Sequence, residues 1–348
     1  CCVVFSSEIL NLVDENVSPC DDFYRFACGG WIHRTAIPDE AGHVSIFEQS
    51  RERLDIQLKD LIESSNDTMP AIVKMKSMYR SCMNLPAIEK LSTEPLKMSL
   101  KQLGGWPVID GDSWDETGFD WINVTQKIRR SGFNWMFVYF FFPPVFFFDF
   151  YNKHRLFLYI LFRRSRYLKC CRCCSIVEPM ATDDKHRWKY FSNSANVNAF
   201  YWSQANSIVI PAGILRDIFF DSDRPQYLNF GTLGYVIGHE ITHGFDNIGA
   251  QFDDTGNARN WWKNETKKHY NDKAQCMIKQ YKEYQLPNSL KINGDLTLKE
   301  NIADNGAIKE AYQAYEKYVA KFGEELPLPG LKYTPKQLFW IAAAMVSV

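Results

Sequence analysis

The amino-acid sequence predicts a mainly α-helical protein with a small β-sheet, of the α+β class. Two observations favour this class: apolar residues recur with a period near 3.6 over several long segments, and a short β-branched run occurs at Ile208–Ile210. The chain has 348 residues, of which 46% are hydrophobic and 23% charged. This composition is typical of a globular protein with two or three domains, and it excludes a disordered chain, a collagen-like repeat and a coiled-coil rod.

The first part of the chain is expected to be mostly helical from residue 10 to residue 132, with Asp14 or Ser18 capping the first helix. Amphipathic patterns predict three further helices, over residues 45–64, 69–81 and 86–103. Gly104-Gly105 follows the last of them and ends it.

From residue 185 onward the composition is again that of a globular protein. Ile208–Ile210 reads as a strand, which Pro211 and Gly213 terminate. Helical periodicity then recurs in three segments, over residues 235–246, 261–284 and 299–322. These patterns predict an N-terminal helical lobe over 10–132 and a second domain over 185–348.

The segment between these domains, residues 133–184, is rich in phenylalanine and then in cysteine and basic residues. A membrane-spanning helix needs about twenty apolar residues, and Pro143-Pro144 interrupts the apolar run here. The segment is therefore left unassigned and is not expected to be a genuine domain. Translated non-coding sequence, a membrane hairpin and a domain insert all stay open.

The charges and cysteines bear on the partners and on the cellular compartment. Forty basic and forty-one acidic residues give a net charge of −1, so no overall field attracts nucleic acid. Ten cysteines and four N-x-S/T sequons, at Asn16, Asn66, Asn123 and Asn264, indicate an oxidising, glycosylating compartment. Buried free thiols in a cytosolic protein are the alternative. The chain starts without Met or a signal segment, and we interpret it as a fragment.

The segment His239-Glu240-Ile241-Thr242-His243 is an H-E-x-x-H motif. On a helix the two histidines lie one turn apart on the same face, so both imidazoles can reach one metal ion. Glu240 points to a neighbouring angle, where its carboxylate can hold a water molecule bound to that ion. The alternative is a surface helix with two incidental histidines, and a third ligand decides between the two.

A candidate third ligand lies downstream in Glu300-Asn301-Ile302-Ala303-Asp304, where two carboxylates are one helical turn apart. Glu300 can complete a set of two histidines and one glutamate with an open fourth position, which is typical of catalytic zinc. Asp304 is then placed to accept the second ring N–H of a ligating histidine, and Asp246 to do so for the other. The two motifs together predict a metal site.

These residues give the sequence a resemblance to the neprilysin and endothelin-converting-enzyme family of zinc metallopeptidases. The resemblance covers about residues 10–132 and 190–340. It rests on six stretches, which are Pro19–Tyr24, Ala27–Trp31, Val197–Tyr201, Pro211–Leu215, Val236–Asp246 and Asn293–Asp304.

The resemblance implies a zincin-like (thermolysin-like) catalytic lobe plus a partial helical N-terminal lobe. It implies one Zn²⁺ ion held by His239, His243 and Glu300, with Glu240 as the general base. Asp246 and Asp304 would lie behind the ligands, and Asp304 is counted among the catalytic residues. Peptide substrates would pair with Asn198 and Ala199, and an apolar pocket would comprise Phe47, Ile214, Phe219 and Val236. Tyr235 stands where a Met is common in the family.

The function implied is a zinc metalloendopeptidase that cleaves small extracellular peptides on the amino side of hydrophobic residues. Family members work outside the cell or at its surface, so membrane association would come from a segment outside this chain. The catalytic domain is expected to be truncated at its C-terminus, because a His and an Arg that stabilise the transition state lie beyond Val348 in the family. The alternative is therefore a catalytically impaired zinc-binding or peptide-binding homologue. Four cysteines, Cys20, Cys28, Cys82 and Cys276, would lack their family partners.

Overall fold

A computed structural model describes residues 2–105, 107–115, 117, 120, 123–124, 126–127, 194–285 and 289–347. The chain divides into two compact units, one of residues 1–58 with 191–348 and one of residues 59–190. The expected boundary after residue 132 thus differs from the division found, because the first 58 residues pack with the C-terminal part. All of the unassigned segment, residues 133–184, lies outside the described part of the chain.

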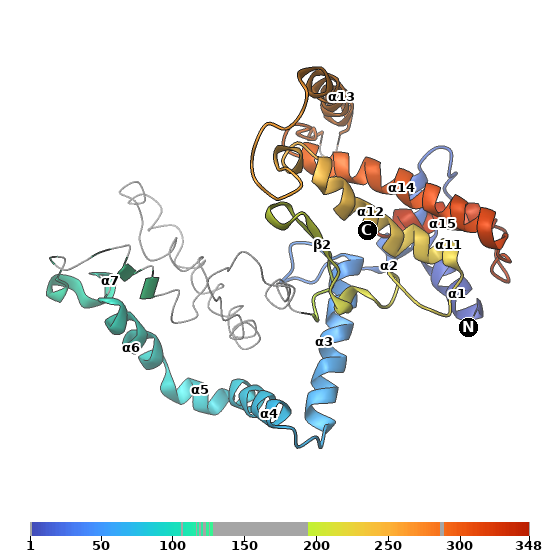
Figure 1. Cartoon of the computed structure of the whole chain (residues 1–348). Helices are drawn as coiled ribbons and strands as arrows, with labels where there is room; N and C mark the ends of the chain where they lie inside the picture. The colour runs from blue at the N-terminus through green and yellow to red at the C-terminus, as the bar shows by residue number, and fades with distance from the viewer. Residues whose placement is uncertain are drawn as a thin grey trace. The chain divides into compact units, whose positions relative to one another are not determined.

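The described part of the first unit consists mainly of helices, together with one two-stranded sheet (Figure 1). Its N-terminal helices are α1 (Cys2–Leu12), α2 (Phe23–Arg34) and the start of α3 (Ile46–Ser64). After the sheet come α11 (Gln226–Asn229), α12 (Tyr235–Thr242), α13 (Asn264–Glu283), α14 (Leu298–Phe322) and α15 (Pro335–Met345). The predicted α+β class is confirmed, and the three C-terminal helical predictions each correspond to a helix.

The first predicted cap is wrong. Helix α1 ends at Leu12, and α2 begins at Phe23 with Asp22 as its N-cap, whose carboxylate accepts a hydrogen bond from the backbone N–H of Arg25. Asp14 instead accepts from the backbone of Asn16 in the connecting turn. Several Asp and Ser residues precede the helix, and composition alone does not select the one whose oxygen reaches an unpaired N–H.

The main hydrophobic core joins α1 and α2 to α11, α14 and α15. Fully buried aromatic and aliphatic side chains fill it, among them Tyr227, Tyr315, Leu338, Phe339 and Ile341. Helix α15 was not predicted, although Thr334-Pro335 and Gln337 carry its signal. The Thr334 hydroxyl accepts from the Gln337 N–H and the Gln337 side chain accepts from the Thr334 N–H, which is a capping box.

The sheet consists of β1 (Phe200–Trp202) and β2 (Ser207–Val209), which pair in antiparallel register with Tyr201 opposite Ile208. Asn206 adopts a left-handed conformation (φ 43°) in the tight connection, and its side chain accepts a hydrogen bond from the Tyr201 hydroxyl. The strand predicted over 208–210 therefore begins one residue earlier in the structure, at Ser207. Strand β1 was not predicted. The β-hairpin directly follows Asn198 and Ala199.

The second unit contains the end of α3 and the helices α4 (Pro70–Met83), α5 (Leu85–Leu91), α6 (Glu94–Leu103) and α7 (Pro107–Asp110). The single helix predicted over 86–103 is wrong. It is two helices, because Ser92 takes a positive φ of 50° and ends α5. Gly104 and Gly105 follow α6 with φ values of 112° and 82°, as expected for a glycine terminator.

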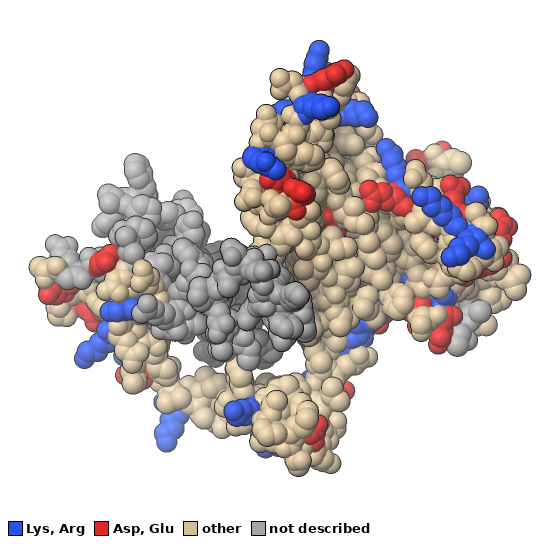
Figure 2. Space-filling view, viewed as in Figure 1, with Lys and Arg blue, Asp and Glu red and all other residues tan. Residues whose placement is uncertain are grey.

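Three observations concern the membrane, the charges and the cysteines. Within the described ranges, no helix has both the length and the apolar character that crossing a membrane requires. Basic and acidic side chains are interspersed on the face drawn in Figure 2. Cys20, Cys28 and Cys276 are free thiols, whereas Cys82 is disulfide-bonded, so the expectation that Cys82 lacks a partner is wrong.

Candidate metal centre

Close packing of α12 against α14 brings the two sequence motifs together. A β-carbon at Gly238 would lie 3.0 Å from the Cα of Ala307, and one at Gly306 would lie 2.5 Å from Cγ2 of Thr242. The two helices can approach this closely only because one residue of each contact is a glycine, which has no side chain. The first turn of α14, which carries Glu300, therefore lies beside the H-E-x-x-H segment of α12.

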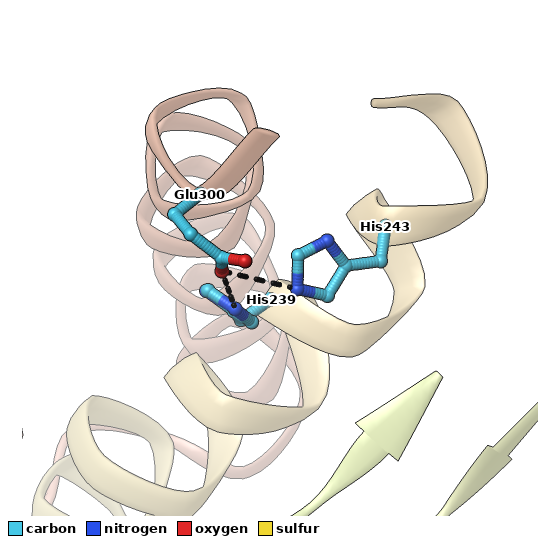
Figure 3. Close-up of side chains that lie close together, drawn as sticks. All are labelled: His239, His243 and Glu300. Atoms are coloured by element: carbon cyan, nitrogen blue, oxygen red, sulfur yellow. Dashed lines mark ion pairs between the residues drawn. The ribbon is translucent and has the colours of Figure 1, made fainter. Parts of the chain in front are cut away.

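Three side chains with metal-binding atoms, His239, His243 and Glu300, converge at this crossing (Figure 3). Oε2 of Glu300 lies 3.3 Å from Nε2 of His239 and 3.4 Å from Nε2 of His243. The two imidazole rings are perpendicular to one another, with their centres 4.4 Å apart. Two imidazole nitrogens and one carboxylate oxygen aimed at a common point are a donor set suited to a divalent transition metal.

Each histidine is held from behind by a carboxylate. Nδ1 of His239 lies 2.8 Å from Oδ1 of Asp304, and Nδ1 of His243 lies 2.7 Å from Oδ2 of Asp246. A carboxylate accepts, so each Nδ1 carries the hydrogen and each Nε2 keeps its lone pair for a metal. Asp246 is completely buried, and its Oδ1 accepts from the backbone N–H groups of Ile248 and Gly249 at 2.7 Å.

The remaining acidic residue of the motif, Glu240, is buried and directly follows His239 on α12, so helical geometry turns it to a neighbouring angle. Burial raises the pKa of Glu240 above its ordinary value, against the opposing charges of His239 and His243 and a hydrogen bond from the backbone N–H of Tyr201. For His239, burial lowers the pKa, but the Asp304 carboxylate and the charges of Glu240 and Glu300 leave the pKa raised overall.

The residues expected to bind substrate lie in the same unit as the metal centre. Asn198 is exposed and Ala199 is buried, and the Asn198 side chain accepts from the Ala199 N–H at 2.9 Å. The four residues of the expected apolar pocket lie together in a second hydrophobic cluster, in which the Phe47 and Phe219 rings are 4.5 Å apart: Phe47, Ile214, Phe219 and Val236.

Two polar residues of this unit, Tyr235 and Arg224, make hydrogen bonds that were not predicted from the sequence. Tyr235 donates its hydroxyl hydrogen to Oδ1 of Asp304 at 2.8 Å. Its position four residues before His239, on the same helix face, was a usable signal. The buried Arg224 donates to the backbone oxygens of Ile218 and Phe219 at 2.8 and 2.9 Å, and no local pattern in the sequence identifies those partners.

Comparison with known families agrees with this geometry. The models of peptidase family M13 match at both ends of the chain, the N-terminal model over residues 19–161 and the second model over residues 198–347. The chain belongs to peptidase family M13. The second match contains all three converging donors, and the first extends into the unassigned phenylalanine-rich segment. The resemblance to the neprilysin family seen in the sequence is thereby confirmed.

Individual M13 relatives match to different extents. Neprilysin-2 of Drosophila melanogaster is 55% identical over 161 residues, which are 46% of this chain and 21% of that protein. Human membrane metallo-endopeptidase-like 1 is 25% identical over an alignment of 630 positions that covers 99% of this chain and 81% of that protein. This chain thus spans about a fifth of the Drosophila protein, and the human alignment is longer than the chain itself.

Two solved structures share the fold. A Haemonchus galactose-containing glycoprotein complex superposes with a TM-score of 0.65 at 19% identity, over 98% of this chain and 88% of that one. An inhibitor complex of a Mycobacterium tuberculosis zinc metalloprotease superposes with a TM-score of 0.64 at 16% identity, over 97% and 90%. At these identities the comparison establishes the fold alone.

Proposed function

We propose that this M13 protein is a zinc metalloendopeptidase that hydrolyses small extracellular peptides on the amino side of hydrophobic residues. The observation that carries the proposal is the convergence of His239, His243 and Glu300, whose donor atoms all lie within 4.8 Å of one another. Three protein ligands leave the fourth position of a tetrahedral site open for water or substrate, which is typical of catalytic zinc.

The residues around the centre have complementary roles in this proposal. A bound zinc ion supplies Lewis acidity, which lowers the pKa of a water molecule and polarises a carbonyl group. Glu240 accepts the proton of the attacking water and delivers it to the amine that leaves. Burial raises the pKa of Glu240, which makes its carboxylate a better proton acceptor than a solvated glutamate. Asp246 and Asp304 orient the two imidazoles throughout.

The proposed substrate preference rests on two features of the unit that contains these donors. Asn198 and Ala199 directly precede β1, so an extended peptide can pair with the backbone there. In this proposal, an apolar side chain on the carboxyl side of the cleaved bond packs against the apolar cluster of Phe47, Ile214, Phe219 and Val236. We further propose an extracellular or cell-surface location, with glycans on the exposed Asn16, Asn66, Asn123 and Asn264.

The test is hydrolysis of short peptides by the wild-type protein and by Glu240→Gln. The variant is expected to lose about 10²–10⁴-fold in kcat/KM, as expected for loss of a general base, while it retains zinc. Glu283→Gln, at an exposed position at the end of α13, serves as the control and is expected to be fully active. A wild-type protein that binds zinc and cleaves no peptide would contradict the proposal and favour a silent zinc-binding protein.

The preference is tested separately, with peptides that differ only in the residue after the cleaved bond. Phe or Leu at that position is expected to give kcat/KM values at least tenfold above those for Gly or Asp, because only the former bury apolar surface. Equal values for all four peptides would contradict the preference and leave the hydrolytic activity intact as a conclusion.

A further inference from the structure

We propose that the Tyr235 hydroxyl is a positioning group for the metal centre, which holds Asp304 in place behind His239 and so strengthens metal binding. Tyr235 and His239 both lie on α12, one helical turn apart. Their polar atoms meet at one oxygen of α14: Oδ1 of Asp304 is 2.8 Å from the Tyr235 hydroxyl and 2.8 Å from Nδ1 of His239. The inference rests on the proposed zinc site.

The hydrogen-bonding capacity of these groups fixes the direction of each bond. A carboxylate oxygen has two lone pairs and can accept from both donors at once. The Tyr235 hydroxyl has one hydrogen, which it donates to Oδ1 of Asp304. The result is one carboxylate oxygen of Asp304 that receives both the Tyr235 O–H and the His239 N–H.

The need for a second donor follows from the exposure of Asp304. Its side chain is 44% exposed, whereas Asp246 behind the other histidine is completely buried. Asp246 is fixed by two backbone N–H groups in addition to His243. At Asp304 water competes for the carboxylate, and the Tyr235 hydroxyl supplies the fixed contact that backbone groups supply to Asp246.

Two effects of the hydroxyl oppose one another. Its hydrogen bond withdraws some negative charge from Asp304, which weakens the polarisation of His239. It also restricts the rotation of a half-exposed carboxylate and therefore of the imidazole that the carboxylate holds. Water can replace the first effect when the hydroxyl is removed, but it cannot replace the second. Removal should accordingly weaken metal binding.

The experiment is a zinc titration of the full chain in competition with a chromophoric chelator, which needs no activity. Tyr235→Phe removes one oxygen and is expected to raise the zinc dissociation constant about three- to tenfold. The control is Tyr281→Phe on α13, whose hydroxyl accepts from Asn305 at 3.2 Å and makes no hydrogen bond to Asp304, and it should leave the constant unchanged. Thermal unfolding of the metal-free variants should match that of the metal-free wild type.

A double-mutant cycle gives the readout that a merely structural role would not produce. In the Asp304→Asn background, Tyr235→Phe should change the dissociation constant less than twofold, because the contact it removes acts through the carboxylate. An equal effect in both backgrounds, or zinc binding by Tyr235→Phe that is unchanged or tighter, would overturn the inference. So would a metal-free Tyr235→Phe protein that unfolds well below Tyr281→Phe. A wild type that binds no zinc would instead overturn the proposed function.

Discussion

Nδ1 of His243 lies 2.7 Å from a completely buried carboxylate, Asp246, while Nδ1 of His239 lies 2.8 Å from a half-exposed one, Asp304. The two candidate ligands are therefore oriented by groups with different access to solvent. When Asp246 is replaced, no water can take over its hydrogen bond to His243. When Asp304 is replaced, water can reach the site.

Asp246→Asn is expected to weaken zinc binding about 10–100-fold, the usual effect of losing an outer partner of a ligand. The amide nitrogen would face His243 as a donor and favour the tautomer that carries its hydrogen on Nε2, which blocks the metal-binding lone pair. Asp304→Asn should cost less, because water can reach that side chain. Competition titration with zinc measures both constants, and a larger loss at Asp304 would contradict the assigned difference.

Gly306→Ala is expected to destabilise the protein by about 1–3 kcal/mol, because the new methyl group would meet the Thr242 side chain at the crossing of α12 and α14. Thermal or urea unfolding of the metal-free protein measures the loss. Gly42→Ala is the control, since nothing lies within 4 Å of a β-carbon there. Combining Gly306→Ala with Thr242→Ala should cost less than the sum of the single changes, and strict additivity would argue against the contact.

Arg224→Lys is expected to cost about 1–3 kcal/mol of stability, because lysine cannot reproduce the planar set of donors that the buried guanidinium offers. These donors bind the backbone oxygens of Ile218 and Phe219 and the Asn229 side chain. The exposed Arg259→Lys is the control and should cost far less. A loss at Arg224 no larger than at Arg259 would contradict this account of the buried network.

Asp253 predicts a defined dependence of stability on pH. Hydrogen bonds from the side chain and backbone of Thr255 and the backbone of Asn257, with the Arg259 ion pair, lower the pKa of Asp253 to about 2. A carboxyl with a lowered pKa in the folded state stabilises above its unfolded pKa, near 3.8, and loses that contribution as pH falls toward 2.

The measurement is the free energy of unfolding of Asp253→Asn against the wild type between pH 6 and pH 2. The variant should be less stable at pH 6, and the difference should shrink below pH 4. The neighbouring exposed Asp254→Asn is the matched control. A difference between Asp253→Asn and wild type that stays constant across this range would be the contrary result.

The grouping of the candidate ligands was largely predictable from the sequence, whereas their surroundings were not. His239 and His243, like Glu300 and Asp304, are four residues apart, and helical geometry alone places each pair on one face. The contact of Tyr235 with Asp304 depends on how closely α12 and α14 approach, which Gly238 and Gly306 determine only in three dimensions.

The N-terminal helices show the same limit on a larger scale. Cys28 of α2 lies against the backbone oxygen of Ala344 in α15, and Tyr333 donates its hydroxyl hydrogen to Glu15. These partners are more than three hundred residues apart in the sequence, so no local pattern could have assigned the first 58 residues to the unit that holds the metal centre. Amphipathic periodicity predicts that a helix has a buried face, but not what covers it.

We propose that His239, His243 and Glu300 form one zinc site, and the zinc content and affinity of wild type and Glu300→Gln test this site directly. We expect one zinc ion per wild-type chain and affinity at least a hundredfold lower in the variant, because an anionic ligand is replaced by a weak neutral one. Glu316→Gln, at an exposed position on the same helix, should bind zinc like the wild type. Substoichiometric zinc in the wild type, or equal affinity in Glu300→Gln, would contradict the claim.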